Sequence, residues 1–191
     1  MPLSPPDALE SSRLRIRLVQ ESDLPDLLAI NGDDEVTRYL PYATWQTPAD
    51  GQAWLKRIDA LHAAGSGLQF VALEKSSGRV VATCLLFRHD EQSARAELGY
   101  VLGREYWGHG LMHEALSALI TYGFETCGLR RLEAEVNPEN ESSNRLIQKL
   151  GFAKEGLLRR RWFAKGSAHD TYIYGLLRDE WPNAGSNQTI S

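Results

Sequence analysis

The stretch that decides the fold is ELGYVLGREYWGHGLMHEA, residues 97–115. Its first half is an apolar strand, and a turn flanked by Gly108 and Gly110 leads at once into a helix. The first amides of a helix have no partner inside the helix, and the peptide dipoles add positive potential there. Glycine lets the backbone bend tightly and lets a ligand approach closely. The stretch therefore predicts a strand, a turn and a helix whose N-terminus binds a phosphate or pyrophosphate.

The hydrophobic pattern on both sides of this stretch predicts the other elements. Strands are expected over 13–18, 69–74, 79–88, 94–102, 131–136, 152–161 and 170–177. Helices are expected over 22–30, 35–40 and 48–61, from Gly110 to about 124, and over 140–149. This order indicates an α/β (α+β) fold: a single mixed, mostly antiparallel sheet with helices on both faces.

One domain is expected, over residues 12–181, because the chain shows no internal repeat and no linker that would divide it. Residues 1–11, with paired prolines and serines, predict a disordered lead-in. Residues 182–191 predict a flexible tail.

Composition limits the classes of protein to which the chain can belong. It has 191 residues, a formal net charge of −4 and two cysteines without metal-type spacing. A nucleic-acid-binding protein would be basic, and thiols outside a disulfide pattern are typical of a reducing compartment. No apolar stretch reaches the length of a membrane span. We therefore expect a cytoplasmic protein without a nucleic-acid or membrane partner.

Other ligands for the glycine turn are excluded by what the turn lacks. A dinucleotide-binding turn would need a third glycine where this chain has His113, and a Walker A loop would need Gly-Lys-Ser/Thr. His109 and His113 are four residues apart, but the zinc-protease order His-Glu-x-x-His is absent and no third ligand stands nearby. Ordinary polar residues are the better interpretation of both histidines, and no metal site is expected.

Several polar residues could carry chemistry in the right context. Glu133 and Glu135 alternate along one predicted strand, so they share a face, and Glu97 lies in the strand that precedes the turn. A carboxylate that faces a cleft can act as a general base, although a solvated sheet face is the simpler interpretation of each. Ser143 lies three residues after Asn140 at a helix start, a spacing that also fits a simple cap.

Taken together, these segments resemble the GNAT superfamily of acetyl-CoA-dependent N-acetyltransferases, in particular its RimJ/RimL-type branch. The superfamily's CoA loop, Gln/Arg-x-x-Gly-x-Gly/Ala, maps to residues 107–112, where Trp107 and Met112 depart from the general form. The branch often has Tyr-Trp-Gly-x-Gly followed by Glu-Ala, which matches residues 106–110 and 114–115.

A second signature of the family lies at the expected distance along the chain. The pattern Asn-Pro-Glu-Asn-x-x-Ser, followed by Gly-Phe, runs from Asn137 through Ser143 to Phe152. The two signatures are in the right order, and the resemblance covers about residues 13–177.

The resemblance implies a binding site for acetyl-CoA. The strands at 97–102 and 131–136 would splay apart, and Asn140 would contact pantetheine between them. The backbone groups that pair with pantetheine would be those of Tyr100, Val101 and Leu102. The pyrophosphate would be bound by the loop residues Trp107, Gly108, His109, Gly110, Leu111 and Met112.

The resemblance also implies catalytic roles. Ser143 matches a residue that hydrogen-bonds the CoA sulfur and protonates the departing thiolate. Glu135 and Glu97 both match positions of a catalytic base in parts of the superfamily. We rank Glu97 slightly ahead and expect it to act through a water molecule.

The implied reaction is direct attack of a neutral primary amine on the acetyl thioester. An α-amino group has a pKa near 7.7–8.0 and lysine one near 10.4, so only the former is about a tenth neutral at pH 7. This difference and the branch resemblance favour a protein or peptide N-terminus as the acceptor. A polyamine, aminoglycoside or toxin acceptor and a non-catalytic CoA-binding module stay open as alternatives. A homodimer is expected only by analogy with relatives.

Overall fold

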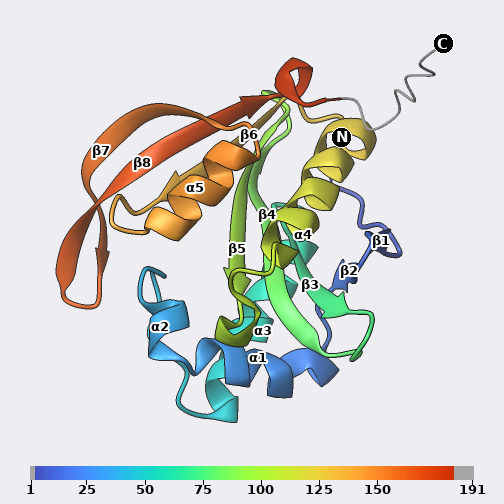
Figure 1. Ribbon diagram of the computed structural model, residues 1–191, viewed down its shortest axis with the longest axis vertical. Coiled ribbons are helices and arrows are strands. Elements are labelled where there is room, and N and C mark those ends of the chain that lie inside the picture. The colour runs from blue at the N-terminus through green and yellow to red at the C-terminus, as the bar shows by residue number, and fades with distance from the viewer. Residues whose placement is uncertain (1–2, 183–191) are drawn as a thin grey trace.

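The computed structural model describes residues 3–182, and its elements follow the predicted order (Figure 1). The strands are β1 (Leu9–Glu10), β2 (Leu14–Leu18), β3 (Leu68–Glu74), β4 (Val80–Asp90), β5 (Arg95–Leu102), β6 (Arg131–Val136), β7 (Ala153–Ala164) and β8 (Ser167–Leu177). The helices are α1 (Leu24–Asn31), α2 (Asp34–Thr37), α3 (Pro48–Ala63), α4 (Leu111–Thr121) and α5 (Glu141–Lys149). None of the described helices is long and apolar enough to cross a membrane.

The described strands form one sheet in the order β1-β2-β3-β4-β5-β6-β8-β7. Neighbouring strands are antiparallel except for β5 and β6, so the predicted mixed, mostly antiparallel sheet is confirmed. The parallel pairing joins only 95–97 to 131–133, although β5 continues to Leu102 and β6 to Val136. The strands therefore separate from about Glu97 onward, as expected, and the sheet opens in its middle (Figure 1).

Helices cover both faces of the sheet and create two apolar layers. On one face, α4 and α5 pack into the main core through fully buried side chains that include Leu116 and Ile147. On the other face, α1 and α3 pack through Leu27 and Ile58. Burying one such side chain stabilises the fold by about 1.5–3 kcal/mol, so these layers hold the opened sheet in place. Trp45 belongs to the second layer, with 5% of its surface exposed.

The N-terminal segment differs from the predicted disordered lead-in. Leu3 is buried in the main core, and the carbonyl of Ser4 accepts a hydrogen bond from the Tyr122 hydroxyl. The short strand β1 then pairs with β2. The prolines and serines hid the isolated apolar residues that anchor this segment. Of the predicted tail, residues 183–191 lie outside the described residues.

Candidate active site

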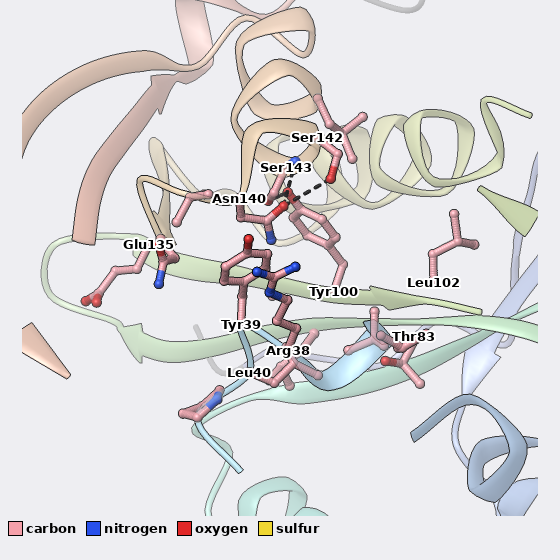
Figure 2. Close-up of a pocket in the computed structure, with 18 of the residues that line it drawn as sticks. Arg38, Tyr39, Leu40, Thr83, Tyr100, Leu102, Glu135, Asn140, Ser142 and Ser143 are labelled. Atoms are coloured by element: carbon pink, nitrogen blue, oxygen red, sulfur yellow. Dashed lines mark hydrogen bonds between the residues drawn. The ribbon is translucent and has the colours of Figure 1, made fainter. Parts of the chain in front are cut away.

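A cleft of about 890 Å³ opens where β5 and β6 separate (Figure 2). This volume lies in the range typical of small-molecule sites. The cleft brings together most of the predicted site residues: Glu97, Tyr100, Val101, Leu102, Trp107, Gly108, Gly110, Met112, Glu135, Asn140 and Ser143. His109 and Leu111 do not line it, because Leu111 is buried in the main core and the His109 carbonyl is bonded to Arg13 on the far side of the loop.

The loop before α4 has the backbone that its glycines predict. Gly108 and Gly110 have φ angles of 80° and 76°, a left-handed conformation that L-residues rarely adopt. A Cβ at Gly108 would meet no protein atom within 4 Å, so the space above this residue is open. The Trp107 indole donates a hydrogen bond of 2.9 Å to the carbonyl of Leu102, which fixes the loop to the end of β5.

The first turn of α5 lies across the cleft from the loop. Asn140 caps the helix, because its Oδ1 accepts hydrogen bonds from the Ser143 amide (3.2 Å) and the Ser142 hydroxyl (3.0 Å) (Figure 2). The simple capping role that the sequence allowed is therefore present. Oδ1 is committed to this cap, whereas the side-chain amide nitrogen is the group that can donate to a ligand.

The Ser143 hydroxyl meets a partner that sequence reasoning missed. Its Oγ lies 2.5 Å from the phenol oxygen of Tyr100, a residue considered until now only for its backbone. Burial raises the pKa of Tyr100 above its ordinary value, so the phenol stays protonated, and either of the two hydroxyls can be the donor in this bond. The alternation of side chains along a strand could have indicated the place of the Tyr100 side chain. Tyr100 is three residues from Glu97 and therefore lies on the opposite face of β5.

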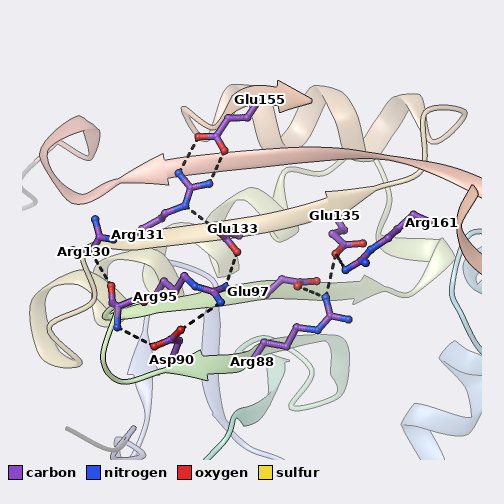
Figure 3. A network of polar contacts seen from close by, with 11 residues as sticks. Arg88, Asp90, Arg95, Glu97, Arg130, Arg131, Glu133, Glu135, Glu155 and Arg161 are labelled. Atoms are coloured by element: carbon purple, nitrogen blue, oxygen red, sulfur yellow. Dashed lines mark hydrogen bonds and ion pairs between the residues drawn. The ribbon is translucent and has the colours of Figure 1, made fainter. Parts of the chain in front are cut away.

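The carboxylates of Glu97 and Glu135 lie on that other face and are joined through one arginine (Figure 3). The Arg88 Nη1 donates to Glu97 Oε2 at 2.6 Å and to Glu135 Oε1 at 3.1 Å. Their side chains are only 9% and 11% exposed, so neither belongs to a solvated sheet face. Burial raises the pKa of Glu97 above the ordinary glutamate value, although the contact with Arg88 opposes this effect.

Glu135 receives further donors from β7. Arg161 contacts its Oε1 at 3.3 Å, and the Trp162 indole donates to its Oε2 at 2.7 Å. Trp162 also lines the cleft. Glu133, the third acidic residue of the pattern, lies outside this cluster and pairs with Arg95 and Arg131 (Figure 3).

Two further hydrogen bonds are made by residues that line the cleft. Lys165, at the tip of the β7–β8 hairpin, donates through Nζ to the carbonyl of Thr37 in α2 at 2.7 Å. The Tyr39 hydroxyl donates to the carbonyl of Glu139 at 3.3 Å. These contacts join segments more than 99 residues apart in sequence and narrow the cleft.

Candidate metal ligands and the thiol of Cys84 add no further group to this cleft among the described residues. No group of three or more His, Cys, Asp or Glu side chains among residues 3–182 is placed to hold a metal ion. Cys84 is fully buried in β4, and burial raises the pKa of its thiol to about 12. Such a thiol stays protonated near neutral pH, so it is a poor nucleophile.

Comparison with known proteins gives this cleft its family. A model described as an acetyltransferase (GNAT) domain matches residues 13–153. The chain belongs to the GNAT acetyltransferase family. The opened sheet, the glycine loop and the start of α5 are thus parts of a GNAT fold, and the protein is an N-acetyltransferase.

Individual GNAT proteins are similar over nearly the whole chain. The uncharacterized N-acetyltransferase p20 of Bacillus licheniformis is 37% identical over 175 residues, which covers 92% of this chain and 98% of that protein. The [ribosomal protein uS5]-alanine N-acetyltransferase of Escherichia coli is 30% identical over 91% and 92% of the two chains. A GCN5-related N-acetyltransferase from Brucella melitensis has a TM-score of 0.85 at 26% identity, covering 95% and 83%.

Proposed function

We propose that the protein transfers an acetyl group from acetyl-CoA to the N-terminal amine of a protein or peptide. The observation that carries the acceptor class is the clamp of Arg88 on the buried carboxylates of Glu97 and Glu135. A polyamine or aminoglycoside carries several positive charges, which are bound best by unpaired carboxylates. Here two arginines, Arg88 and Arg161, already balance the charge of the two carboxylates, so the site favours an acceptor with one reacting amine.

The groups along the cleft fit acetyl-CoA, the donor that GNAT acetyltransferases use. The left-handed turn at Gly108 and Gly110 and the first amides of α4 would bind the pyrophosphate. The edge of β5 from Tyr100 to Leu102, beyond its pairing with β6, would pair with pantetheine. The amide nitrogen of Asn140 would donate a hydrogen bond to the same group.

The proposed acid and base approach the reacting atoms from opposite faces of the sheet. The amine nitrogen attacks the thioester carbonyl carbon, and the bond from that carbon to sulfur breaks. Glu97 takes the amine proton through a water molecule, and the Ser143 hydroxyl gives its proton to the sulfur. The backbone amide of Val101 would stabilise the negative charge that develops on the carbonyl oxygen. Only the gap between β5 and β6 lets one substrate contact both groups.

The E. coli relative supports the acceptor class, because its name states that it acetylates an alanine of a ribosomal protein. A protein N-terminus also suits the chemistry, since about a tenth of α-amino groups are neutral at pH 7. The neutral fraction of such an acceptor can attack directly, so the base has to remove a proton from the amine only after the attack has begun. Glu97, which is buried and paired with Arg88, can take that proton.

A small amine is the second candidate, and a specific observation favours it. The hydrogen bonds from Lys165 to Thr37 and from Tyr39 to Glu139 narrow the acceptor end of the cleft. A slim acceptor passes these contacts, whereas a peptide must displace at least one of them.

An assay of CoA thiol release across a panel of acceptors decides between the two. The panel contains peptides with free alanine, serine or methionine N-termini, the same peptides with blocked N-termini and an internal lysine, spermidine, an aminoglycoside and free amino acids. We expect turnover with free N-termini and none with the blocked peptides. Turnover confined to spermidine or the aminoglycoside would contradict the proposed acceptor.

A binding measurement controls for the donor. Acetyl-CoA at about a hundred times its Kd should raise the free energy of unfolding by roughly 2.7 kcal/mol. Ser143→Ala should keep this stabilisation while it slows turnover. An unchanged rate in Ser143→Ala would contradict the role given to the hydroxyl.

A further inference from the structure

Arg13 holds the CoA loop from behind through several bonds at once. Its Nη1 donates to the carbonyl of His109 at 2.9 Å, and its Nε donates to Glu114 Oε2 at 2.7 Å. The Arg13 backbone amide and the Ser11 hydroxyl both donate to the other carboxylate oxygen of Glu114, at 2.6 Å and 2.8 Å. The residue just before β2 is thereby joined to the loop and to the first turns of α4, which lie about a hundred residues later.

The contact with His109 sets the direction of one peptide unit. In a trans peptide, the carbonyl and the following N–H point in opposite directions. Because the His109 carbonyl points to Arg13, the amide of Gly110 points away from Arg13. Gly110 lines the cleft, and Arg13 does not. The bond from Arg13 therefore turns the Gly110 amide toward the cleft.

We propose that Arg13 is a positioning residue for the pyrophosphate of CoA, acting through the His109 carbonyl; this inference rests on the proposed seat of the pyrophosphate. The ion pair with Glu114 largely neutralises the charge of Arg13, so its effect is geometric. A guanidinium can donate to the carboxylate and the carbonyl at the same time, whereas an ammonium group cannot reproduce this fork. Without that restraint the left-handed turn at Gly108 and Gly110 is free to rotate its amides.

A truncated donor tests this assignment. S-acetylpantetheine carries the same thioester as acetyl-CoA but lacks the pyrophosphate, and both are compared with whichever acceptor is turned over fastest. In Arg13→Gln we expect KM for acetyl-CoA to rise about tenfold with kcat nearly unchanged. The rate with S-acetylpantetheine should stay at the wild-type value, which also shows that the variant is folded. Arg13→Lys should resemble Arg13→Gln.

Arg15 provides the matched control. It lies two residues along β2, is well exposed and pairs with Glu10 at 3.8 Å, so Arg15→Gln should leave both donors unaffected. If Arg13→Gln lowered kcat/KM equally with acetyl-CoA and with S-acetylpantetheine, or lowered it with neither, the positioning role would be overturned. A wild-type KM in Arg13→Lys would overturn the action through the carbonyl.

The same assay separates this inference from the proposed function. If the wild-type protein uses acetyl-CoA no better than S-acetylpantetheine, the pyrophosphate seat itself is wrong. If the wild type prefers acetyl-CoA and Arg13→Gln keeps that preference, the seat stands and the role of Arg13 is wrong. The stabilisation by CoA in thermal unfolding gives the same comparison without an acceptor.

Discussion

The two halves of the cleft are built from different kinds of groups. The half proposed to bind CoA, called the CoA half, consists of the loop 107–112, the free edge of β5 and the start of α5, and it offers mainly backbone amides and glycines. The half proposed to bind the acceptor, called the acceptor half, consists of Arg88, Glu97, Glu135 and their partners on β7, and it offers charges that are largely shielded from solvent. Under the proposed function, backbone groups would bind the donor, whereas side chains from four strands would select the acceptor.

The largest expected effect on the rate comes from a substitution in the acceptor half alone. Glu97→Gln should lower kcat by about a hundredfold, because it removes the proposed base without changing shape, and should leave KM for acetyl-CoA unchanged. Glu135→Gln should have a smaller effect, since Arg161 and Trp162 already occupy its oxygens. Initial rates of both variants under saturating acetyl-CoA make the comparison. A lower kcat in Glu135→Gln than in Glu97→Gln would reverse the assignment of the base.

The pH profile of the same variants sharpens this result. Burial raises the pKa of Glu97, so the rate of the wild type should fall on acidification above the ordinary glutamate range of about 4.3. Arg88→Gln removes a group that holds this pKa down, so the fall should move to higher pH. A fall that stays in place in Arg88→Gln would show that another group titrates.

The difference between the halves also explains what could be predicted from sequence. The CoA half depends on local features, namely a glycine turn and a helix cap, and these can be identified within 20 residues. The acceptor half depends on Arg88 meeting Glu135, 47 residues away, from a bulged position with a φ of 50°. No local pattern marks such a bulge, so neither Arg88 nor the clamp was predicted.

The fold was predictable for the same reason that the glycine turn and the helix cap were. Strands and helices have their own periods, and the strand over 131–136 matches its predicted bounds. The hydrogen bond between Tyr100 and Ser143 is different, because its partners lie 43 residues apart on a strand and a helix. The ordered segment around Leu3 likewise depends on tertiary packing that only the folded core provides.

The second largest effect is expected from a substitution in the CoA half alone, and it concerns KM for acetyl-CoA. Gly108→Ala places a methyl group in the open space above the loop and should raise KM for acetyl-CoA about tenfold, with kcat nearly unchanged. Gly78→Ala is the matched control, because Gly78 has a φ of 70° and equally open surroundings in the β3–β4 turn. Both variants should lose about 1–2 kcal/mol of stability from the strained backbone. Equal KM values for the two variants would remove the loop from the donor site.

A smaller effect tests the contact at which the two halves meet. Tyr100→Phe removes the hydrogen-bond partner of Ser143 but keeps the ring, and should lower kcat about threefold to tenfold, as expected for one neutral hydrogen bond. KM for acetyl-CoA should not change. Ser143→Ala combined with Tyr100→Phe should be no slower than Ser143→Ala, because the phenol acts only through the hydroxyl. Additive losses would give Tyr100 a direct role in the reaction.

The smallest effect compares the two halves through stability rather than rate, using one glutamate from each. The folded state raises the pKa of Glu97, because burial outweighs the contact with Arg88. Glu114, behind the CoA loop, differs: burial alone would raise its pKa, but the bonds from Arg13 and Ser11 outweigh burial and lower it. The two carboxylates should therefore change the free energy of unfolding in opposite directions as pH changes.

The signs follow from proton linkage. A raised pKa means that the folded protein binds the proton more tightly, so the stability contributed by Glu97 is lost as pH rises through its folded pKa. A lowered pKa means the reverse, so the contribution of Glu114 is lost as pH falls below the unfolded value. Denaturant unfolding of Glu97→Gln and Glu114→Gln at pH 4 and pH 7 measures both. Relative to the wild type, Glu97→Gln should gain stability between pH 4 and 7 and Glu114→Gln should lose it. If the stability of both variants, relative to the wild type, changed in the same direction between pH 4 and 7, the folded state would shift the two glutamate pKa values in the same direction. That result would contradict the opposite shifts expected for Glu97 and Glu114.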